Sequence, residues 1–152
     1  MGVHSRSITA AVDPKVVWQR WANVENWPAD DPDLAKARLN GPLVKGAIGW
    51  LQPKGGLKTQ FKLVEVDRQK NRFSLETKLP LAVLTFEHSL HRPEHRADEH
   101  EALAELDPGA WVLTHSLTIT GPLARLWDRI VGRSFTKGLP TVLANIVRAA
   151  AL

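Results

Sequence analysis

The sequence predicts an α+β fold in which a twisted antiparallel sheet surrounds a long C-terminal helix. Three observations predict it. The chain opens with a strand-like alternation that leads into helical segments, its centre alternates apolar and polar residues between turn signals, and it ends in a long amphipathic segment. A chain of 152 residues can bury roughly two-thirds of its unfolded surface in one core. We therefore expect a single domain over residues 1–152.

The N-terminal part predicts one strand and two helices. Residues 4–12 alternate, and Asp13-Pro14 is typical of a helix start, with aspartate as N-cap and proline in the first turn. Val17, Trp18 and Trp21 then recur at helical spacing. Trp27 precedes a proline, which disfavours the helical region, so we expect this helix to end there. Residues 30–36 predict a second short helix that begins at Asp31.

The centre of the chain predicts antiparallel strands. Short strand-like runs at residues 37–40, 47–52 and 57–66 are separated by Gly and Pro turns, such as the one at residues 53–56. From residue 57 onward, alternation separates a dry face from a solvated face on each strand. At least six strands follow from this pattern. Residues 93–106 are charged and rich in Glu, Ala and Leu, which favours an inserted helix or loop.

The C-terminal stretch, residues 123–151, predicts the longest helix. Its apolar positions include Leu139, Leu143 and Ile146, and we expect glycines and Pro140 to bend it. Three arginines recur every fourth residue and form a basic stripe that we expect to be solvated: Arg125, Arg129 and Arg133.

Composition excludes several classes of protein. The chain has no cysteine, so it has neither disulfides nor thiolate metal sites, and this fits a reducing compartment. A net charge of +4, with acidic and basic residues interspersed, does not indicate nucleic-acid binding. No apolar run has the ~20 residues that a stable membrane insertion needs, and the charged, alternating N-terminus is unlike a signal peptide. We expect a cytoplasmic protein.

The order of elements and several short motifs resemble the START-like helix-grip (SRPBCC) superfamily, and most of all its polyketide cyclase/dehydrase branch. The motifs are Asn26-Trp27-Pro28, Gly41-Pro42-Leu43, Phe86-Glu87-His88, Thr114-His115-Ser116 and Gly121-Pro122-Leu123. The resemblance spans nearly the whole chain. It implies a seven-stranded curved sheet around the C-terminal helix and a ligand cavity between them. Members bind lipids, hormones, quinones or polyketides.

Two histidines are the candidate catalytic residues. Alternation places His88 and His115 on the dry face of strands that we expect to be neighbours. They can serve a ligand as hydrogen-bond donors or move a proton near neutral pH. The alternative is that each is a core histidine bonded to a backbone carbonyl or to water. No carboxylate shares their face at ligand spacing, so we expect no metal there. His91, His95 and His100 fall in or beside the charged insertion, where a solvated face is the simpler interpretation.

Large apolar and hydroxyl side chains on the dry faces are the candidate ligand contacts, and each of them can instead be core. We assign to the cavity wall Trp50, Thr59, Phe61, Phe73, Leu75, Thr77, Leu84, Phe86, Trp111 and Leu113. The resemblance adds Trp27, which lies where the family has a gate. Trp18 and Trp21 are expected to pack the first helix against the sheet.

Three functions are compatible with this pattern. The first is a carrier or sensor that binds a hydrophobic small molecule, such as a lipid, quinone or polyketide-like compound, without a cofactor. The second is an aromatase/cyclase or dehydratase type of enzyme that uses His88 or His115 as general acid or base. The third is a protein-interaction module without a ligand. The chain is expected to act as a monomer or a homodimer.

Overall fold

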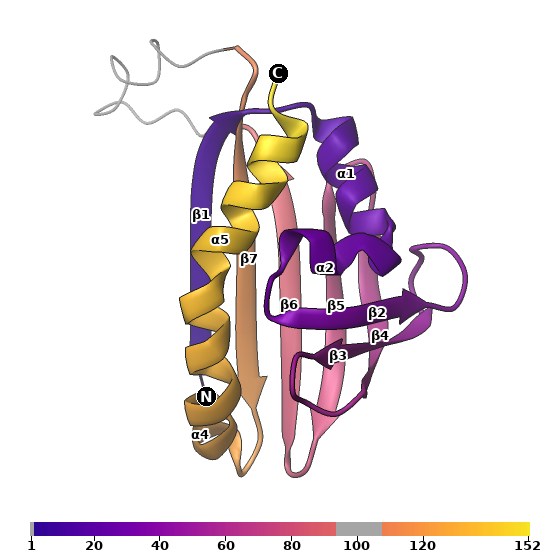
Figure 1. Cartoon of the computed structure of the whole chain (residues 1–152), viewed down its shortest axis with the longest axis vertical. Coiled ribbons are helices and arrows are strands. Elements are labelled where there is room, and N and C mark those ends of the chain that lie inside the picture. The colour runs from indigo at the N-terminus through magenta and orange to yellow at the C-terminus, as the bar shows by residue number, and fades with distance from the viewer. Residues whose placement is uncertain (1, 94–107) are drawn as a thin grey trace.

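A seven-stranded antiparallel sheet dominates the structure (Figure 1). The computed structural model describes residues 2–93 and 108–152. The strands follow the order β1-β7-β6-β5-β4-β3-β2, so β1 and β2 form the edges. Their bounds are β1 (Gly2–Ala11), β2 (Leu34–Leu39), β3 (Ile48–Pro53), β4 (Thr59–Asp67), β5 (Arg72–Leu79), β6 (Ala82–His91) and β7 (Ala110–Thr120).

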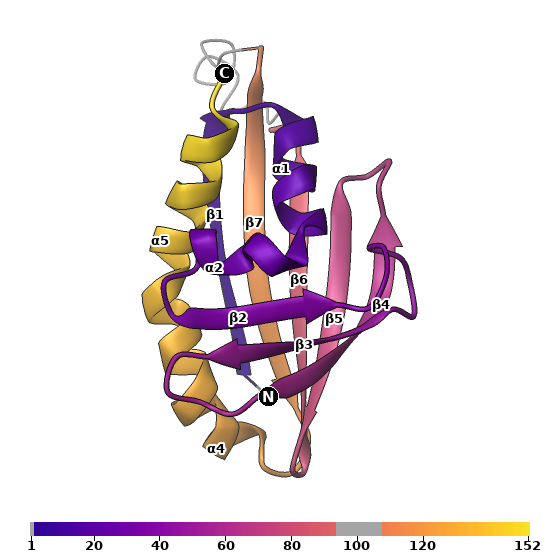
Figure 2. The same cartoon turned by 45° about the vertical axis from the view of Figure 1, so that its right-hand side comes forward.

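The helices lie on one side of this sheet (Figure 2). They are α1 (Pro14–Ala22), a single 3₁₀ turn η1 (Val24–Asn26), α2 (Trp27–Asp30), α4 (Ala124–Trp127), a π-helical segment η3 (Asp128–Gly132) and α5 (Arg133–Ala150). The sheet curls so that β2 and β3 cross in front of the long strands, beside α5. The α+β class, the curved seven-stranded sheet and the long C-terminal helix are thereby confirmed.

The alternation predicted from residue 57 onward places most of its apolar positions in the core, but Leu57 lies outside β4 and is 86% exposed. Phe61, Leu63, Phe73 and Leu113 are each at most 1% exposed. They form one continuous cluster with the inner faces of α1 and α5, including Trp18, Trp21 and Leu143. The packing of both tryptophans of α1 against the sheet is thus confirmed. In α1, Asp13 caps the helix by accepting from the backbone N–H of Lys15, as its sequence predicted.

The helix predicted at residues 30–36 was wrong. The second helix is α2, which begins at Trp27, and residues 34–39 form the edge strand β2. Trp27 has helical backbone angles (φ −52°, ψ −38°) despite the following proline. Helix α2 tolerates Pro28 because this residue falls in the first turn, where no backbone N–H is needed. Asp31 accepts instead from the N–H of Asp33 in a local turn that directs the chain into β2.

The C-terminal helix contains one wide turn. Segment η3 is π-helical, and Pro140 lies inside α5 without ending it. Side chains from β1 and α5 fasten this turn: His4 Nε2 pairs with Asp128, and Thr136 Oγ1 lies 2.8 Å from His4 Nδ1. Gly132 has no room for a Cβ, because the Asp128 carboxylate and the His4 ring occupy that space. The wide turn therefore holds one end of the helix against β1.

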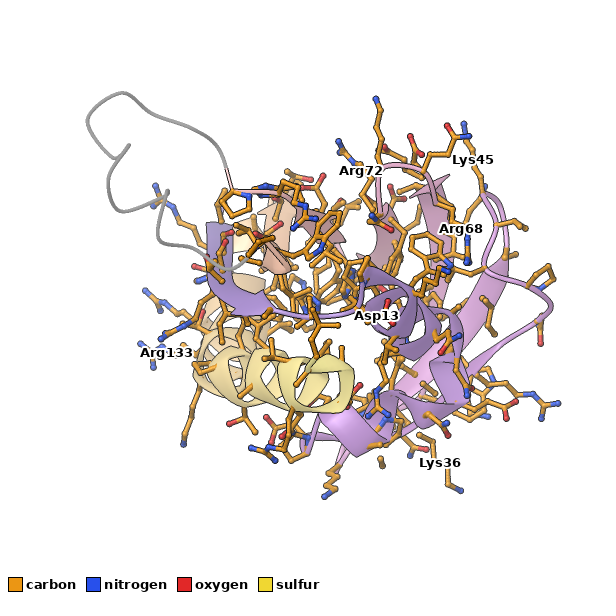
Figure 3. The ribbon with its side chains drawn as sticks, turned by 90° about the horizontal axis from the view of Figure 1, so that it is seen from above. Asp13, Lys36, Lys45, Arg68, Arg72 and Arg133 are labelled. Atoms are coloured by element: carbon orange, nitrogen blue, oxygen red, sulfur yellow. The ribbon has the colours of Figure 1, made fainter. Side chains whose placement is uncertain are left out.

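Two further expectations concern the surface. Arg125, Arg129 and Arg133 are exposed, as predicted, and Arg133 points away from the fold in Figure 3. The helix or loop expected at residues 93–106 lies outside the described residues, apart from Pro93. In the described part of the chain, no helix is long and apolar enough to cross a membrane.

Candidate functional site

A cavity of about 250 Å³ lies between the inner face of the sheet and α5, under the α2–β2 connection. Its wall is mainly apolar and includes four aromatic side chains, Trp21, Trp27, Phe86 and Phe135. The remaining lining residues are Arg20, Asp30, Asp31, Asp33, Leu34, Leu51, Pro53, Leu75, His88, His115, Val131, Ser134, Gly138, Leu139, Val142 and Ile146. Asp33, Pro53 and Ser134 are exposed, so the cavity reaches the surface between β2, β3 and α5.

Strand register brings the two histidines together on the cavity wall. His88 in β6 pairs directly with His115 in β7, and on its other side with Phe73 in β5. The rings of His88 and His115 meet edge to face with centroids 4.3 Å apart, and His88 stacks flat on Phe73 at 4.2 Å. Trp21 Nε1–H donates to His115 Nε2 over 3.3 Å. Residues from helix α1 and three strands therefore fix both imidazoles.

Burial keeps both imidazoles neutral. Removing a charged ring from water costs free energy, so burial lowers the pKa of His115 from 6.5 to about 3. The pKa of His88 is lowered well below 6.5, first by burial and then by the neighbouring His115. His88 Nδ1 is fully buried and has no hydrogen-bond partner in the described residues. The inner wall of the cavity thus offers two uncharged ring edges.

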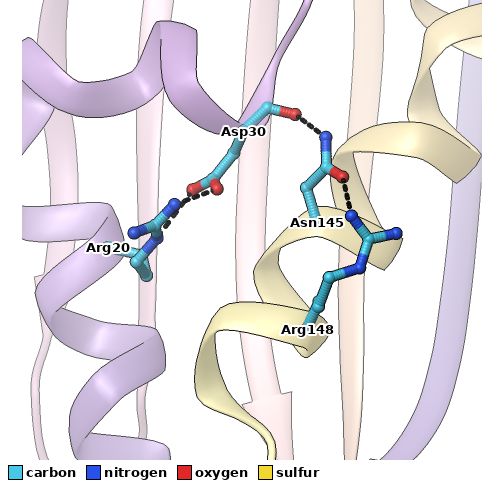
Figure 4. A network of polar contacts seen from close by, with 4 residues as sticks. All are labelled: Arg20, Asp30, Asn145 and Arg148. Atoms are coloured by element: carbon cyan, nitrogen blue, oxygen red, sulfur yellow. Dashed lines mark hydrogen bonds and ion pairs between the residues drawn. The ribbon is translucent and has the colours of Figure 1, made fainter.

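The opposite side of the cavity is acidic. Arg20 Nε donates to Asp30 Oδ2 over 3.1 Å, a second guanidinium N–H bonds Asp30 Oδ1, and these bonds raise the pKa of Arg20 (Figure 4). The backbone carbonyl of Asp30 accepts from Asn145 in α5 over 2.9 Å. This chain of contacts ties α1, α2 and α5 together beside the cavity. Burial raises the pKa of Asp31, and the carboxylates of Asp33 and Asp30 act in the same direction.

No group of three or more His, Asp or Glu side chains is arranged to hold a metal ion within residues 2–93 and 108–152. His91 is exposed, and its Nδ1 contacts the carbonyl of Arg92. His95 and His100 lie outside the described residues. The described lining residues offer hydrogen bonds, aromatic contacts and charged groups at the opening.

The structure brings five of the candidate site residues to the cavity wall: Trp27, Leu75, Phe86, His88 and His115. A second group is buried on the same face but packs inside the core without lining the cavity: Phe61, Phe73, Thr77, Leu84 and Leu113.

Three candidate residues lie away from the cavity. The buried position on β3 is Gly49, so the next residue, Trp50, points to the other face. There Lys58 Nζ lies 3.9 Å from the centre of its ring. The ring of Phe61 lies where a Cβ of Gly49 would be. Trp111 borders the core and is covered by the Arg92 guanidinium, 4.4 Å from its ring centre. Thr59 donates to the carbonyl of Leu57 at the start of β4.

Sequence reasoning missed the acidic opening and the helical wall. Asp30, Asp31 and Asp33 fall in the segment predicted as a short helix, although three aspartates around Pro32 are an equally good turn signal. On α5, the apolar spacing of Leu139, Val142 and Ile146 was visible, but periodicity does not separate core contacts from cavity contacts.

The sheet, the gripping helix and the cavity between them define a helix-grip protein with an internal site. No protein-family model matches the sequence, and no curated protein matches it. Solved structures show the fold: it is the START-like helix-grip fold, as the sequence motifs indicated. A START superfamily protein from Mycobacterium smegmatis has a TM-score of 0.62 and 10% identity, over 96% of this chain and 97% of the other.

Two further structures share the fold. A hypothetical protein from Helicobacter pylori superimposes with a TM-score of 0.75 at 11% identity, over 98% of this chain and 88% of that chain. Norcoclaurine synthase from Thalictrum flavum, solved with dopamine and hydroxybenzaldehyde, has a TM-score of 0.64 at 13% identity, over 96% of this chain and 83% of the other. At these identities the likeness concerns the fold alone.

Proposed function

We propose that this protein binds a hydrophobic small molecule in the cavity between the sheet and α5. The observation that carries the proposal is a cavity of about 250 Å³ that an all-apolar core would have filled. Its wall combines aromatic and aliphatic side chains with a few polar groups, which is the usual composition of small-molecule sites. Neighbours of this fold include a protein solved with two small aromatic compounds, and this supports the same use of the cavity.

A binding role is favoured over acid–base catalysis by the histidines themselves. General acid–base catalysis works best when the pKa of the group lies near the working pH. The pKa of His115 is lowered to about 3 by burial, so at neutral pH it is a weak base. The polyketide cyclase or dehydratase alternative would need a bound substrate that raises this value.

The proposal is tested with N-phenylnaphthylamine, an uncharged dye that fluoresces when it leaves water. We expect saturable binding to the wild-type protein. Val142→Trp should abolish it, because Val142 lines the cavity and an indole there occupies the space. Thr141→Trp is the matched control, since the neighbouring position on α5 is exposed.

Far-ultraviolet circular dichroism verifies that both variants fold. Ser134→Trp provides a second test at the exposed opening, where a large side chain is compatible with folding. Dye binding that is equal in wild type, Val142→Trp and Ser134→Trp contradicts a ligand in this cavity. That result would favour the interaction-module alternative, which needs no cavity.

A further inference from the structure

We propose that the inner end of this cavity recognises an uncharged carbonyl oxygen, held by the ring N–H groups of His88 and His115, and that the cavity rejects anionic ligands. The ligand class is then a neutral ketone-type compound with an apolar body, as opposed to a fatty acid or other carboxylate. This inference rests on the proposed binding function and specifies its chemistry.

The contact with Trp21 determines the protonation of His115. An indole N–H can only donate, so His115 Nε2, 3.3 Å away, is the acceptor. A neutral imidazole carries one hydrogen, and burial keeps this ring neutral by lowering its pKa to about 3. The hydrogen therefore resides on Nδ1. His115 presents an N–H donor, and this donor has no partner among the described residues.

His88 presents a second donor. The Nδ1 atom of His88 is fully buried and has no partner among the described residues, and Phe73 covers one face of the ring. A buried N–H without an acceptor is rarer and costlier than a buried unprotonated nitrogen without a donor. The hydrogen of the neutral ring is therefore assigned to Nε2. In the part of the chain that the structure describes, Nε2 also has no hydrogen-bond partner and is not among the fully buried atoms. Both rings line the cavity with centroids 4.3 Å apart, so the two donors are close enough for a single ligand oxygen to lie near both.

The charges around the cavity exclude an anion. Among the described lining residues the only cation is Arg20, and both of its bonds shown in Figure 4 go to Asp30. Asp31 and Asp33 also line the cavity and add negative charge. A buried carboxylate needs a cation or several N–H donors to offset its desolvation. A carboxylate ligand would instead meet two neutral imidazoles and the carboxylates of Asp31 and Asp33.

The apolar wall accommodates the rest of such a ligand. Trp27 and Phe86 lie on the wall with the histidines, and Phe86 meets Phe135 of α5 edge to face, with ring centroids 5.7 Å apart. Aromatic walls favour a flat apolar body through offset and edge contacts. A bicyclic aromatic ketone therefore combines the two features that the cavity can satisfy.

Competition with bound N-phenylnaphthylamine tests the inference. Three competitors share one naphthalene body and differ at one ring position: acetonaphthone, ethylnaphthalene and naphthoate. We expect the ketone to bind about tenfold more tightly than the hydrocarbon, which corresponds to about two neutral hydrogen bonds, and we expect naphthoate not to compete. His88→Phe keeps the stacking on Phe73 and removes one of the two donors, so it should lower the preference for the ketone to about threefold without weakening ethylnaphthalene.

His91→Phe is the matched control, because His91 is exposed on the same strand, and it should keep the preference. Infrared spectra give an independent readout: the carbonyl stretch of bound acetonaphthone should shift to lower frequency, and the shift should be smaller in His88→Phe than in wild type. If dye and ethylnaphthalene bind but the ketone gains nothing, or if naphthoate competes equally, the inference is wrong while the binding function stands. If the dye itself does not bind the cavity, the binding function fails first.

Discussion

Mild acid should destabilise this protein through the two histidines of the cavity wall, His88 and His115. Burial lowers the pKa of His115 to about 3 and that of His88 well below 6.5. The unfolded chain then binds protons at a pH where the folded chain does not. This contribution to stability is fully present above about pH 6.5 and is lost progressively as the pH falls toward the folded-state pKa.

The size of the effect follows from the pKa shift. Each pH unit below the unfolded pKa costs about 1.4 kcal/mol for each histidine that stays neutral in the fold. Between about pH 7.5 and about pH 5.5, where few carboxylates titrate, this amounts to about 1–1.5 kcal/mol for His115, and His88 adds a loss in the same direction. Urea unfolding followed by tryptophan fluorescence at both pH values measures the change.

Substitution of the two histidines tests whether they cause the loss of stability on acidification. The double variant His88→Phe/His115→Gln should lose most of the pH dependence in that range, whatever its stability at neutral pH. His91→Gln removes an exposed histidine of β6 and should leave the dependence unchanged. Equal losses of stability on acidification in the wild type and in the double variant would refute the assignment, because the protons would then be binding elsewhere.

Two further substitutions test the packing around the site. Arg20→Met leaves Asp30, which is only 5% exposed, without its cation. We expect the free energy of unfolding in urea to fall by about 2–3 kcal/mol. This is less than for a fully buried pair, because the Arg20 side chain is 30% exposed. Adding Asp30→Leu should recover part of that loss, and no recovery would contradict an unpaired charge as its cause. Gly49→Ala places a methyl group against the backbone carbonyl oxygen of Arg38 and 2.6 Å from a ring carbon of Phe61, and it should cost about 1–3 kcal/mol in thermal unfolding. Gly56→Ala, whose closest contact would be 3.3 Å, is its control, and similar losses in both variants would contradict the close approach.

The strands from residue 59 onward were predictable because alternation is a local signal. Placing His88 and His115 on adjacent dry faces needed only the period of two and the hairpin order, and the register then set the two histidines directly opposite each other. Trp50 shows the limit of this reasoning. A large apolar residue beside a glycine looks like the inward one, yet Gly49 is the buried position of β3, where a Cβ would meet the Arg38 carbonyl and the Phe61 ring.

The opening of the cavity could not be predicted from local sequence patterns. Trp27 and Asp30 belong to a one-turn helix, and so short a segment has no stable periodicity to detect. Its position depends on the carbonyl of Asp30 meeting Asn145, which is 115 residues further along the chain. The same holds for the division between core and cavity. Phe73 and Phe86 share one pattern, but Phe73 packs against Trp21 and Trp27, whereas Phe86 lines the cavity.

The π-helical turn η3 gives the C-terminal helix a place where its length can vary. An α-helix advances about 100° per residue, so inserting or deleting one residue inside α5 rotates every later side chain by about that angle. Leu139 and Val142 would then leave the cavity wall. A π-turn holds one extra residue, and removing it restores an ordinary α-turn while both flanking faces keep their direction. Changes in helix length at Asp128–Gly132 are therefore uncoupled from the helix face that meets the ligand.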